Sequence, residues 1–560
     1  MFIKRISALL VCAALLSGLT ASAQAVEFPD VSTEHWAYAD IQKASGYGLI
    51  QGLEDGTFRP EETLNRASFV TILQRMFSWE DVLPASPSFS DVRPGDWYYA
   101  AAETARAHGV TGEETLFQPM AYITREDMAV MLVRALGYES LAGDIAPLGV
   151  PFPDVTSHPG HIALSAAIGM TTGVEVDGQL LFQPDAFATR GQAAAMLSRV
   201  YERYCSTIDW LNGFYAFSSY SQISFTDEMD VVSVGWARMS YDADAGPWLN
   251  STSSGGNDWV KPQDASTATS YFQGNGTPYT LNVYADTTQD VALPDGSRTS
   301  VLETILPDPS VRAQAVAALT AAASDYAGIT IDFEGLRTDL LKADFVSFMT
   351  ELRAALPSGK TLFVCVPPND WYKGYDFRAL GEVCDKVIYM VHDYQWTSVP
   401  SYQIGKPMGT TEDTSSPVTP FPDVYRALQA ITDAETGVQD KSKIALQISF
   451  GTAGFQVDEN GNLLSSTIYH PAQNTIAKRL LQSDTVVTYD DHTRNPAALY
   501  TTEDGSRILL WYEDARSVAD KLTLARMFGI TGVSVWRLGN IPAYSDVPNY
   551  DVWSAILAQR

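Results

Sequence analysis

The sequence predicts a multidomain protein in which N-terminal α-helical repeats precede a (β/α)8 TIM barrel with a small α+β insertion. The chain has 560 residues, enough for three or four domains. Its first third repeats the same landmarks about every 60 residues, which is typical of a repeat architecture. From residue 210 onward, short apolar strands alternate with helical segments, the pattern of parallel βα units.

The first 25 residues have the pattern of a secretory signal peptide. Lys4 and Arg5 provide a charged start, and residues 6–19 form an apolar run. That run is too short to cross a bilayer, which takes about 20 residues. No other apolar run in the sequence is long enough to do so. We therefore expect residues 1–25 to be removed and the remaining chain to be secreted without a membrane span.

The composition is strongly acidic. The chain has 66 Asp and Glu against 37 Lys and Arg, for a net charge of −29 at pH 7. This surplus argues against nucleic acid and anionic lipid as partners. Cys205, Cys365 and Cys384 lack metal-type spacing, so we expect buried free thiols, with a Cys365–Cys384 disulfide as the alternative. We expect no metal and no cofactor.

Three repeated units occupy residues 26–84, 85–147 and 148–205. Each opens with a Phe-x-Asp-Val segment, at residues 28–31, 89–92 and 152–155. A Trp follows the opening Phe in the first two units, as Trp36 and Trp97. A Phe-x-Pro segment then precedes a second amphipathic helix, which begins at an Arg in every unit, namely Arg66, Arg125 and Arg190.

These units resemble S-layer homology modules. The T-R-A-E-like motif of that family appears at residues 65–68, 124–127 and 189–192. The resemblance implies that Arg66, Arg125, Arg190, Trp36 and Trp97 bind a pyruvylated secondary cell-wall polymer, since a guanidinium suits bidentate capture of a carboxylate. The third unit lacks the Trp, so we expect Arg190 to contribute less. The alternative is three packing repeats whose Arg residues are purely structural.

The C-terminal region, residues 210–560, alternates predicted strands and helices. Eight strands are predicted, at 213–217, 231–236, 280–284, 328–334, 361–367, 386–392, 444–450 and 532–536. Helices are predicted at 310–325, 340–356, 377–383, 424–432 and 517–528. Eight strands suit a (β/α)8 barrel, whose active site lies at the carboxyl ends of the strands. Residues 456–507 interrupt the pattern and are predicted to form a small insertion that borders the cleft.

The fourth predicted strand, Gly328–Glu334, alternates strictly between apolar and polar residues. Asp332 and Glu334 share one face, with Cα atoms roughly 7 Å apart at about 3.3 Å per residue. Like charges held this close raise the pKa of one carboxyl, and a carboxyl that stays protonated near neutral pH can serve as a general acid. The alternative is that both acids cap a following helix.

This strand resembles the D-x-x-D-x-D-x-E signature of glycoside hydrolase family 18, the chitinase-like family. Asp332 and Glu334 match its last two acids, while Ala327 and Thr330 stand at the first two acidic positions. The remaining "IDFE" core is similar to the spore-cortex and cell-wall lytic branch of that family. Residues 511–514, which precede the last predicted helix, also resemble that branch.

Two further strand ends resemble the same family. Residues 390–394 stand where the family has M-x-Y-D; Asp393 matches the acid, and His392 replaces the Tyr. Trp536 ends the eighth strand, where the family places a Trp under the sugar at the cleavage point. An aromatic face can stack on a sugar. Ordinary core packing is the alternative for Trp536.

The resemblance implies a substrate-assisted, retaining mechanism. Glu334 would protonate the glycosidic oxygen, and the acetamido oxygen of the substrate would attack the anomeric carbon while Asp332 orients the acetamido group. Asp393, His392, Trp536 and Thr330 would contact the substrate.

The leading hypothesis is a secreted glycosidase attached to the bacterial cell wall or S-layer. Its substrate would be peptidoglycan or another polysaccharide that contains N-acetylglucosamine. The alternative is a weak or inactive, lectin-like surface-layer protein.

Overall fold

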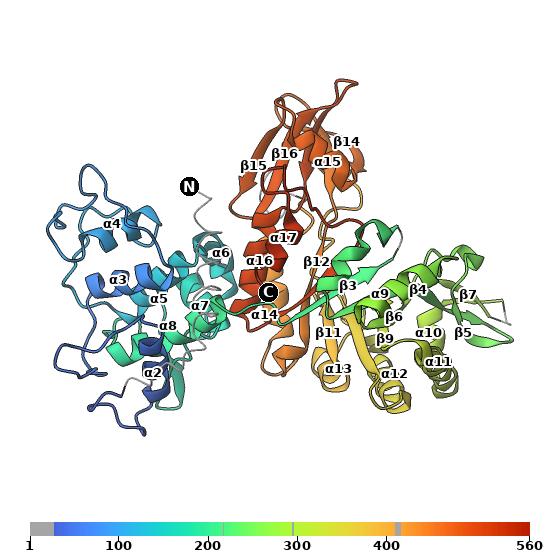
Figure 1. Cartoon of the computed structure of the whole chain (residues 1–560), viewed down its shortest axis with the longest axis horizontal. Helices are drawn as coiled ribbons and strands as arrows, with labels where there is room; N and C mark the ends of the chain where they lie inside the picture. The colour runs from blue at the N-terminus through green and yellow to red at the C-terminus, as the bar shows by residue number, and fades with distance from the viewer. Residues whose placement is uncertain (1–26, 217, 294–295, 409–415) are drawn as a thin grey trace. The chain divides into compact units, whose positions relative to one another are not determined.

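The computed structural model describes residues 27–216, 218–293, 296–408 and 416–560. These residues form two compact units that divide between Thr207 and Ile208 (Figure 1). The predicted signal peptide, residues 1–25, lies outside the described residues. Among those that are described, no helix combines the length and the apolar character that a membrane crossing requires.

The N-terminal unit consists of three pairs of helices. The first helices of the pairs are α2 (Tyr38–Gly46), α4 (Tyr99–Ala107) and α7 (Pro159–Ala167), and the second helices are α3 (Arg66–Met76), α5 (Arg125–Ala135) and α8 (Arg190–Tyr204). Each second helix begins at the repeated Arg because the residue before it is an N-cap. Asn65, Thr124 and Thr189 each accept a hydrogen bond from the backbone N–H three residues ahead.

The three repeats close into a ring. Helix α4 packs against α3 of the preceding repeat and α7 against α5, and α2 of the first repeat packs against α8 of the third. Backbone bonds follow the same cycle: Ile123 N–H donates to Leu64 O at 2.9 Å, Ala188 N–H to Ile123 O at 2.9 Å, and Leu64 N–H to Ala188 O at 3.0 Å. The unit therefore has pseudo-threefold symmetry, in which each joint lies between two repeats.

In the C-terminal unit, eight parallel strands of the described residues form a closed barrel. They are β3 (Trp210–Tyr215), β4 (Val231–Asp242), β6 (Tyr279–Asp286), β9 (Gly328–Glu334), β10 (Thr361–Val366), β11 (Lys386–Tyr389), β12 (Ile444–Ser449) and β18 (Gly532–Trp536). Their order is β3–β18–β12–β11–β10–β9–β6–β4, and β3 pairs with β4 to complete the circle. The antiparallel strand β5 (Gly246–Asn250) extends β4.

Helices surround the barrel (Figure 1). They are α9 (Ala265–Asn275), α10 (Val301–Ile305), α11 (Pro309–Ala322), α12 (Lys342–Ala355), α13 (Phe377–Val383), α14 (Phe421–Ile431), α16 (Ala515–Met527) and α17 (Val552–Leu557). Several begin at aspartate N-caps, as α11 does at Asp308, α13 at Asp376 and α16 at Asp514. The predicted barrel fold is confirmed, although sequence patterning missed α9, α10 and α17.

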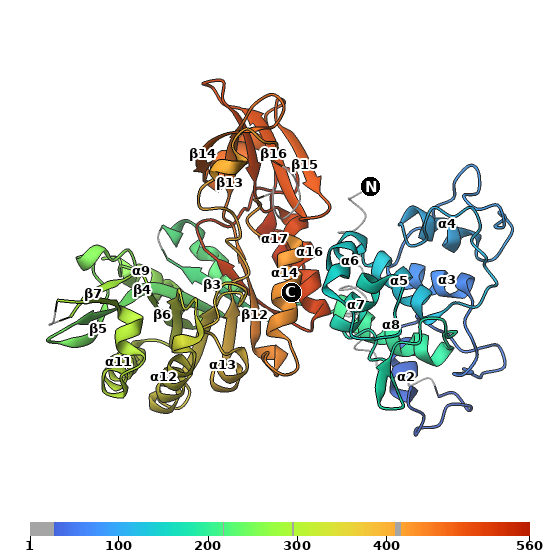
Figure 2. The same ribbon diagram turned by 180° about the vertical axis from the view of Figure 1, so that it is seen from behind.

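The insertion in the barrel is a small antiparallel sheet with one helix. Its order is β14 (Leu463–Tyr469), β13 (Ala453–Val457), β17 (Arg507–Trp511), β16 (Asn495–Thr501) and β15 (Val486–Asp490), and α15 (Gln473–Leu480) lies between β14 and β15 in the chain. The insertion extends beyond the predicted residues 456–507, because it begins with β13 at Ala453 and ends with β17 at Trp511, and these two strands pair with each other. Figures 1 and 2 show it beyond the end of the barrel at which β12 finishes.

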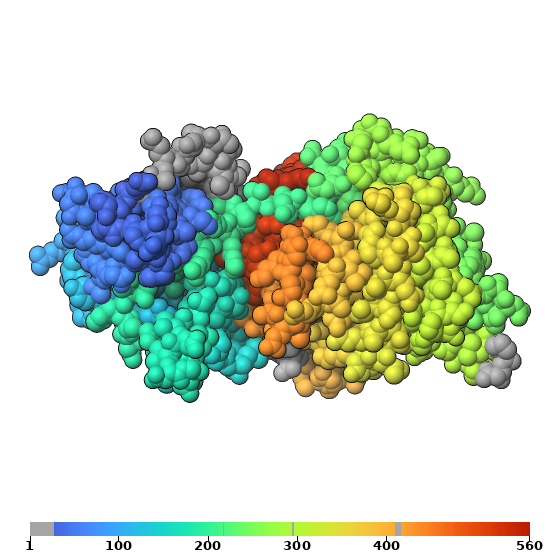
Figure 3. Space-filling view, turned by 90° about the horizontal axis from the view of Figure 1, so that it is seen from below, coloured from blue at the N-terminus to red at the C-terminus, as the bar shows by residue number. Residues whose placement is uncertain are grey.

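A belt of polar side chains crosses the barrel interior. Ser534 Oγ donates to Asn212 Oδ1 at 2.8 Å, Asn212 Nδ2 donates to Ser233 Oγ at 3.1 Å, and Ser233 Oγ lies 3.1 Å from Thr330 Oγ1. All four residues have no exposed surface. This belt satisfies the buried polar groups beneath the carboxyl ends of the strands. Figure 3 shows the molecule from below the view of Figure 1, where the segments coloured yellow and orange lie against one another.

Candidate functional site

The two acids of β9 face the interior of the barrel. Their apolar neighbours face outward, and Phe333 packs against Phe348 of α12 with ring centroids 5.3 Å apart. The predicted alternation of this strand is therefore correct. The acids do not cap the next helix, because the side chain of Thr338 caps the turn that follows. Asp332 and Glu334 thus lie together at the carboxyl end of a central strand, where barrel active sites form.

Asp332 is almost completely enclosed, with 3% of its surface exposed. Burial raises its pKa to about 6, while a hydrogen bond from Asn282, the thiol of Cys365 and the charge of His392 act in the opposite direction. Asn282 Nδ2 donates to Asp332 Oδ2 at 3.3 Å. Asp332 Oδ1 has no hydrogen-bond partner within the described residues. This buried acceptor is free to receive a donor from a bound substrate.

Glu334 ends the strand and is half-buried. Burial, followed by the negative charges of Asp332, Asp393 and Asp286, raises the pKa of Glu334 well above its usual value. Asp286 lies opposite Glu334 in the pairing of β6 with β9. Tyr284 donates to Asp286 Oδ2 at 2.6 Å, which holds that second carboxylate in place. A protonated Glu334 beside carboxylates is suited to donate a proton to a leaving oxygen.

His392 and Asp393 follow β11, which ends at Tyr389 rather than at the predicted His392. His392 Nδ1 lies 2.8 Å from Asp393 Oδ2, and its Nε2 lies 2.7 Å from Gln447 Oε1. Burial lowers the pKa of His392, but the charge and hydrogen bond of Asp393 and the hydrogen bond to Gln447 outweigh it, so the pKa is raised. Because both ring nitrogens face acceptors, the geometry favours the imidazolium form.

Trp536 is half-buried and takes part in an aromatic cluster. Its ring centroid lies 5.3 Å from that of Phe214 and 5.9 Å from that of Trp259. Trp259 in turn stacks on Tyr284 at 4.7 Å. Trp536 therefore packs in the core as the alternative proposed, yet part of its surface stays open at the end of the barrel. Both interpretations of this residue are compatible with its position.

Thr330 does not fit the substrate contact predicted for it. Its side chain has no exposed surface, and its Oγ1 lies 2.7 Å from Thr280 Oγ1 and 3.1 Å from Ser233 Oγ. It belongs to the polar belt, two residues below Asp332 on the same strand face. Thr330 thus supports the acidic pair from beneath, and a sugar in the cleft would not reach it.

Sequence reasoning missed several residues around the acids. Asn282 and Tyr284 stand two apart on β6 and pair in register with Thr330 and Asp332, so the period of two in that strand could have revealed them. Trp259 and Gln447 gave no comparable signal. The three predicted free thiols Cys205, Cys365 and Cys384 are confirmed as unpaired and buried.

In the N-terminal unit, each repeated arginine lies at a joint between repeats. The Nε of Arg66 donates to Phe117 O at 3.0 Å, that of Arg125 to Phe182 O at 2.8 Å, and that of Arg190 to Phe58 O at 2.7 Å. Each guanidinium also lies over the ring of the same Phe, at 4.8 to 5.5 Å. The arginines therefore have the structural role that the alternative proposed. Some of their outer nitrogens also have partners: Arg190 Nη2 donates to Gln51 O at 2.9 Å, and Arg66 lies 3.5 Å from Asp127 and 3.8 Å from Glu114.

The ring also decides which arginine meets which tryptophan. Gly191 N–H donates to Pro60 O, and a Cβ built on Gly191 would lie 3.6 Å from Trp36 Cζ2. Arg190 therefore belongs to the joint that contains Trp36. By the pseudo-threefold symmetry of the ring, Arg66, which bonds to Phe117, belongs to the joint that contains Trp97. Both tryptophans are more than half exposed, at 59% and 64%. The reason given for a weaker Arg190, the missing Trp of its own repeat, is consequently wrong.

The joint of Arg125 differs from the other two. Gly160 stands at the Trp position of the third repeat, and a Cβ there would lie 1.7 Å from Ala142 O of α6 (Glu139–Ile145). Glu126 next to the arginine is already bound, because its Oε1 accepts from Ser157 at 2.5 Å and lies 2.6 Å from His158 Nδ1. This joint thus has a packed helix where the others have an exposed aromatic ring.

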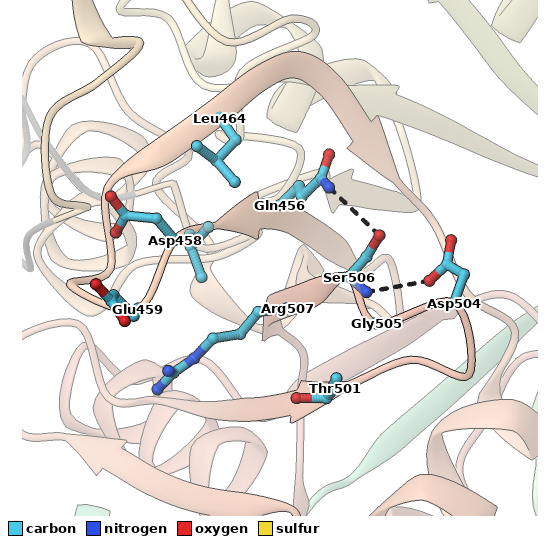
Figure 4. A pocket seen from close by; sticks show the side chains of 10 residues that line it. Gln456, Asp458, Glu459, Leu464, Thr501, Asp504, Gly505, Ser506 and Arg507 are labelled. Carbon is cyan, nitrogen blue, oxygen red and sulfur yellow. Dashed lines mark hydrogen bonds between the residues drawn. The ribbon is translucent and has the colours of Figure 1, made fainter.

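A hollow of about 390 Å³ also lies in the insertion, between the turns after β13 and β16 (Figure 4). Its polar groups bond to one another, since Gln456 Nε2 donates to Ser506 Oγ at 3.3 Å and Ser506 N–H donates to Asp504 Oδ1 at 3.1 Å. None of the predicted site residues lines it. We therefore place the candidate active site at the acids of β9.

Both the C-terminal barrel and the N-terminal repeats match models of known families. Residues 307–540 match the model of glycosyl hydrolases family 18. This match lies entirely within the C-terminal unit. Residues 27–70 and 88–129 match the S-layer homology domain, and the third repeat, outside those matches, makes the same joints as the first two.

Individual relatives cover parts of the chain. The S-layer protein EA1 of Bacillus anthracis is 30% identical over 206 residues, 36% of this chain and 23% of that protein. The cortical fragment-lytic enzyme of Bacillus cereus is 25% identical over 244 residues, 42% of this chain and 52% of that enzyme. The chain thus spans about half or less of these curated relatives. The solved spore cortex-lytic enzyme SleL of Bacillus cereus aligns with 69% of this chain and 78% of its own, at 17% identity and a TM-score of 0.46.

Proposed function

We propose that this protein is a secreted glycosidase, attached to the bacterial cell wall, that hydrolyses a polymer containing N-acetylglucosamine. The observation that carries the proposal is the pair of buried Asp332 and half-buried Glu334 at the carboxyl end of β9. The match to family 18 supports hydrolysis of a glycosidic bond, and the matches to the S-layer homology domain support attachment. The cortical fragment-lytic enzyme of Bacillus cereus, similar over 42% of this chain, favours a cell-wall polymer, and we take peptidoglycan as that polymer.

Glu334 is the proposed general acid. Its raised pKa keeps the carboxyl protonated, so it can donate to the glycosidic oxygen as the bond breaks. After the leaving sugar departs, the carboxylate that remains can accept a proton from water. The other carboxylates that face Glu334 make its ionised form costly, which favours the return of that proton.

Asp332 is the proposed positioning group for the acetamido substituent. It is buried, and its Oδ1 lacks a partner within the described residues, so an acetamido N–H entering the cleft would satisfy it. That contact would aim the acetamido oxygen at the anomeric carbon, as the substrate-assisted mechanism requires. The expected stereochemical result is retention.

The wall polymer is proposed to bind at the joints that pair an arginine with a tryptophan. Arg190 with Trp36, and Arg66 with Trp97, each offer a cation beside an exposed aromatic face. The joint of Arg125 should contribute little, because Gly160 stands at its Trp position and it offers no aromatic face.

The decisive experiment compares the wild-type chain with Glu334→Gln on purified wall sacculi and on chito-oligosaccharides. Gln keeps the shape of Glu but cannot donate the proton, so hydrolysis should fall by roughly 10²- to 10⁴-fold. Mass spectrometry of the products measures hydrolysis, and circular dichroism checks the fold. Glu435→Gln, at an exposed glutamate in the turn after α14, is the matched control for the loss of one carboxylate.

A wild-type rate for Glu334→Gln would remove Glu334 from the mechanism. Binding of sugar without any hydrolysis by the wild-type chain would favour the lectin-like alternative. Products from sacculi or from chito-oligosaccharides would also distinguish peptidoglycan from chitin as the substrate.

A further inference from the structure

A second cavity, of about 480 Å³, lies at the same end of the barrel as the acids. Two neighbouring loops line it, residues 337–342 after β9 and residues 369–375 after β10. Backbone bonds join the loops: Lys373 N–H donates to Arg337 O at 3.1 Å, and Gly374 N–H donates to Leu336 O at 3.0 Å. A Cβ at Gly374 would lie 2.4 Å from the Cβ of Leu336, so only glycine allows this close approach. The backbone bonds and this close approach therefore fix the two loops, and with them the walls of the cavity, relative to each other.

The lining of this cavity is basic in a protein that is strongly acidic overall. Arg337, Lys342 and Lys373 line it, against the single acid Asp339. None of these three cations forms a salt bridge with any residue that the structure describes. Arg337 lies instead over the ring of Tyr372 at 4.9 Å. Three cations against one carboxylate around a single cavity favour the binding of an anion there.

The cavity is connected to the acids through two aromatic residues. Tyr375 lines it and donates to Phe333 O at 2.7 Å, directly before Glu334 in the chain. Trp371, on the loop between Asn369 and Lys373, is 51% exposed and lies against Tyr394, which follows Asp393, with ring centroids 5.3 Å apart. An exposed ring at this position offers a face on which a sugar can stack between the acids and the cavity.

We propose that the cavity of Arg337, Lys342 and Lys373 binds a carboxylate carried by the substrate polymer, so that the enzyme selects sugars bearing an acidic substituent. Muramic acid residues, with their lactyl carboxylate or the peptide attached to it, have this chemistry, whereas chitin is neutral. The proposal rests on the proposed glycosidase function and specifies its substrate. A guanidinium and two ammonium groups suit a carboxylate, and Trp371 would hold the sugar that bears it.

Binding can be measured without hydrolysis. The probes are a tetrasaccharide of alternating N-acetylglucosamine and N-acetylmuramic acid, and its methyl ester, titrated by calorimetry into the Glu334→Gln chain. The acid should bind at least about tenfold more tightly than the ester, the usual loss for hydrogen bonds to a charged group. Added Arg337→Gln and Lys373→Gln substitutions should abolish the difference. Arg378→Gln, at an exposed cation outside the cavity, should retain it.

Equal binding of acid and ester would overturn the proposal, and this comparison needs no change to the cavity, so it holds even if the double variant misfolds. A difference that survives the double substitution would also overturn it. Displacement of the tetrasaccharide by glycerol 1-phosphate but not by lactate would indicate a phosphate site instead, and so contradict the carboxylate assignment.

Kinetics separate this proposal from the function on which it rests. In the otherwise wild-type chain, the ratio of kcat/KM for the acid to that for the ester should fall about tenfold when Arg337 and Lys373 become Gln. Absence of hydrolysis with an intact preference for the acid in calorimetry would support the cavity and reject the glycosidase. Hydrolysis of both probes at equal rates would support the glycosidase and reject the cavity.

Discussion

Replacing Lys521 of α16 by Met should destabilise the C-terminal unit strongly. Lys521 has no exposed surface, and Glu513, its partner, is 2% exposed. The ammonium donates to both carboxylate oxygens, at 2.8 and 2.7 Å. Ser517 and Asn495 donate to the same carboxylate, at 2.5 and 2.8 Å, and Asn495 belongs to β16 of the insertion. The pair therefore ties the inserted sheet to the barrel helix.

The substitution leaves the Glu513 charge buried with two neutral donors. Removal of one partner from a buried ion pair costs about 3–5 kcal/mol. Unfolding entropy of about 2.1 cal/mol/K per residue, over the roughly 350 residues of this unit, gives about 0.7 kcal/mol/K near the melting temperature. The free-energy loss therefore corresponds to a fall in Tm of about 4–7 °C.

Differential scanning calorimetry of the whole chain measures this fall in the transition of the C-terminal unit. Lys478→Met, at an exposed position of α15, is the control and should leave the Tm unchanged within about 1 °C. Combining Lys521→Met with Glu513→Leu removes both charges and should recover most of the loss, because a buried pair can be replaced by apolar side chains at little cost. A Tm for Lys521→Met within about 1 °C of wild type would refute the reasoning.

Three further outcomes are expected. Asp332→Asn should lower activity and move the alkaline limb of the kcat/KM profile to lower pH. Glu334 acts in its protonated form, and loss of the negative charge at position 332 lowers the Glu334 pKa. An alkaline limb that moves to higher pH would contradict this. Arg66→Ala and Arg190→Ala should each reduce sedimentation with purified wall fragments more than Arg125→Ala, and the reverse order would disprove the assignment of joints. A thiazoline analogue of the oxazolinium ion should inhibit hydrolysis competitively, whereas a covalent sugar adduct trapped on Asp332 would exclude the substrate-assisted mechanism.

Local regularities explain how much the sequence alone revealed. The period of two in Gly328–Glu334 follows from strand geometry, so the strand and the inward direction of Asp332 and Glu334 were predictable from one segment. The N-caps before Arg66, Arg125 and Arg190 act within one helical turn. The first residues of those helices were therefore also predictable from the local sequence.

Long-range partners could not be predicted in this way. Sequence order suggested that Arg190 shares a site with its own repeat, but the ring joins it to Trp36, more than 150 residues earlier in the chain. Thr330 occupies an acidic position of the family pattern, yet only barrel closure brings it against Ser233 and Thr280.

The sequence by itself determined the order of the two units, the barrel strands and the identity of the acidic pair, because each depends on residues close together in the chain. The tertiary structure alone decided which partners those residues meet. The proton on His392 depends on Asp393 and on Gln447 of another strand, and the basic cavity exists because two loops are joined by backbone bonds. Such contacts arise when distant segments are brought together by ring and barrel closure, and no local pattern encodes them.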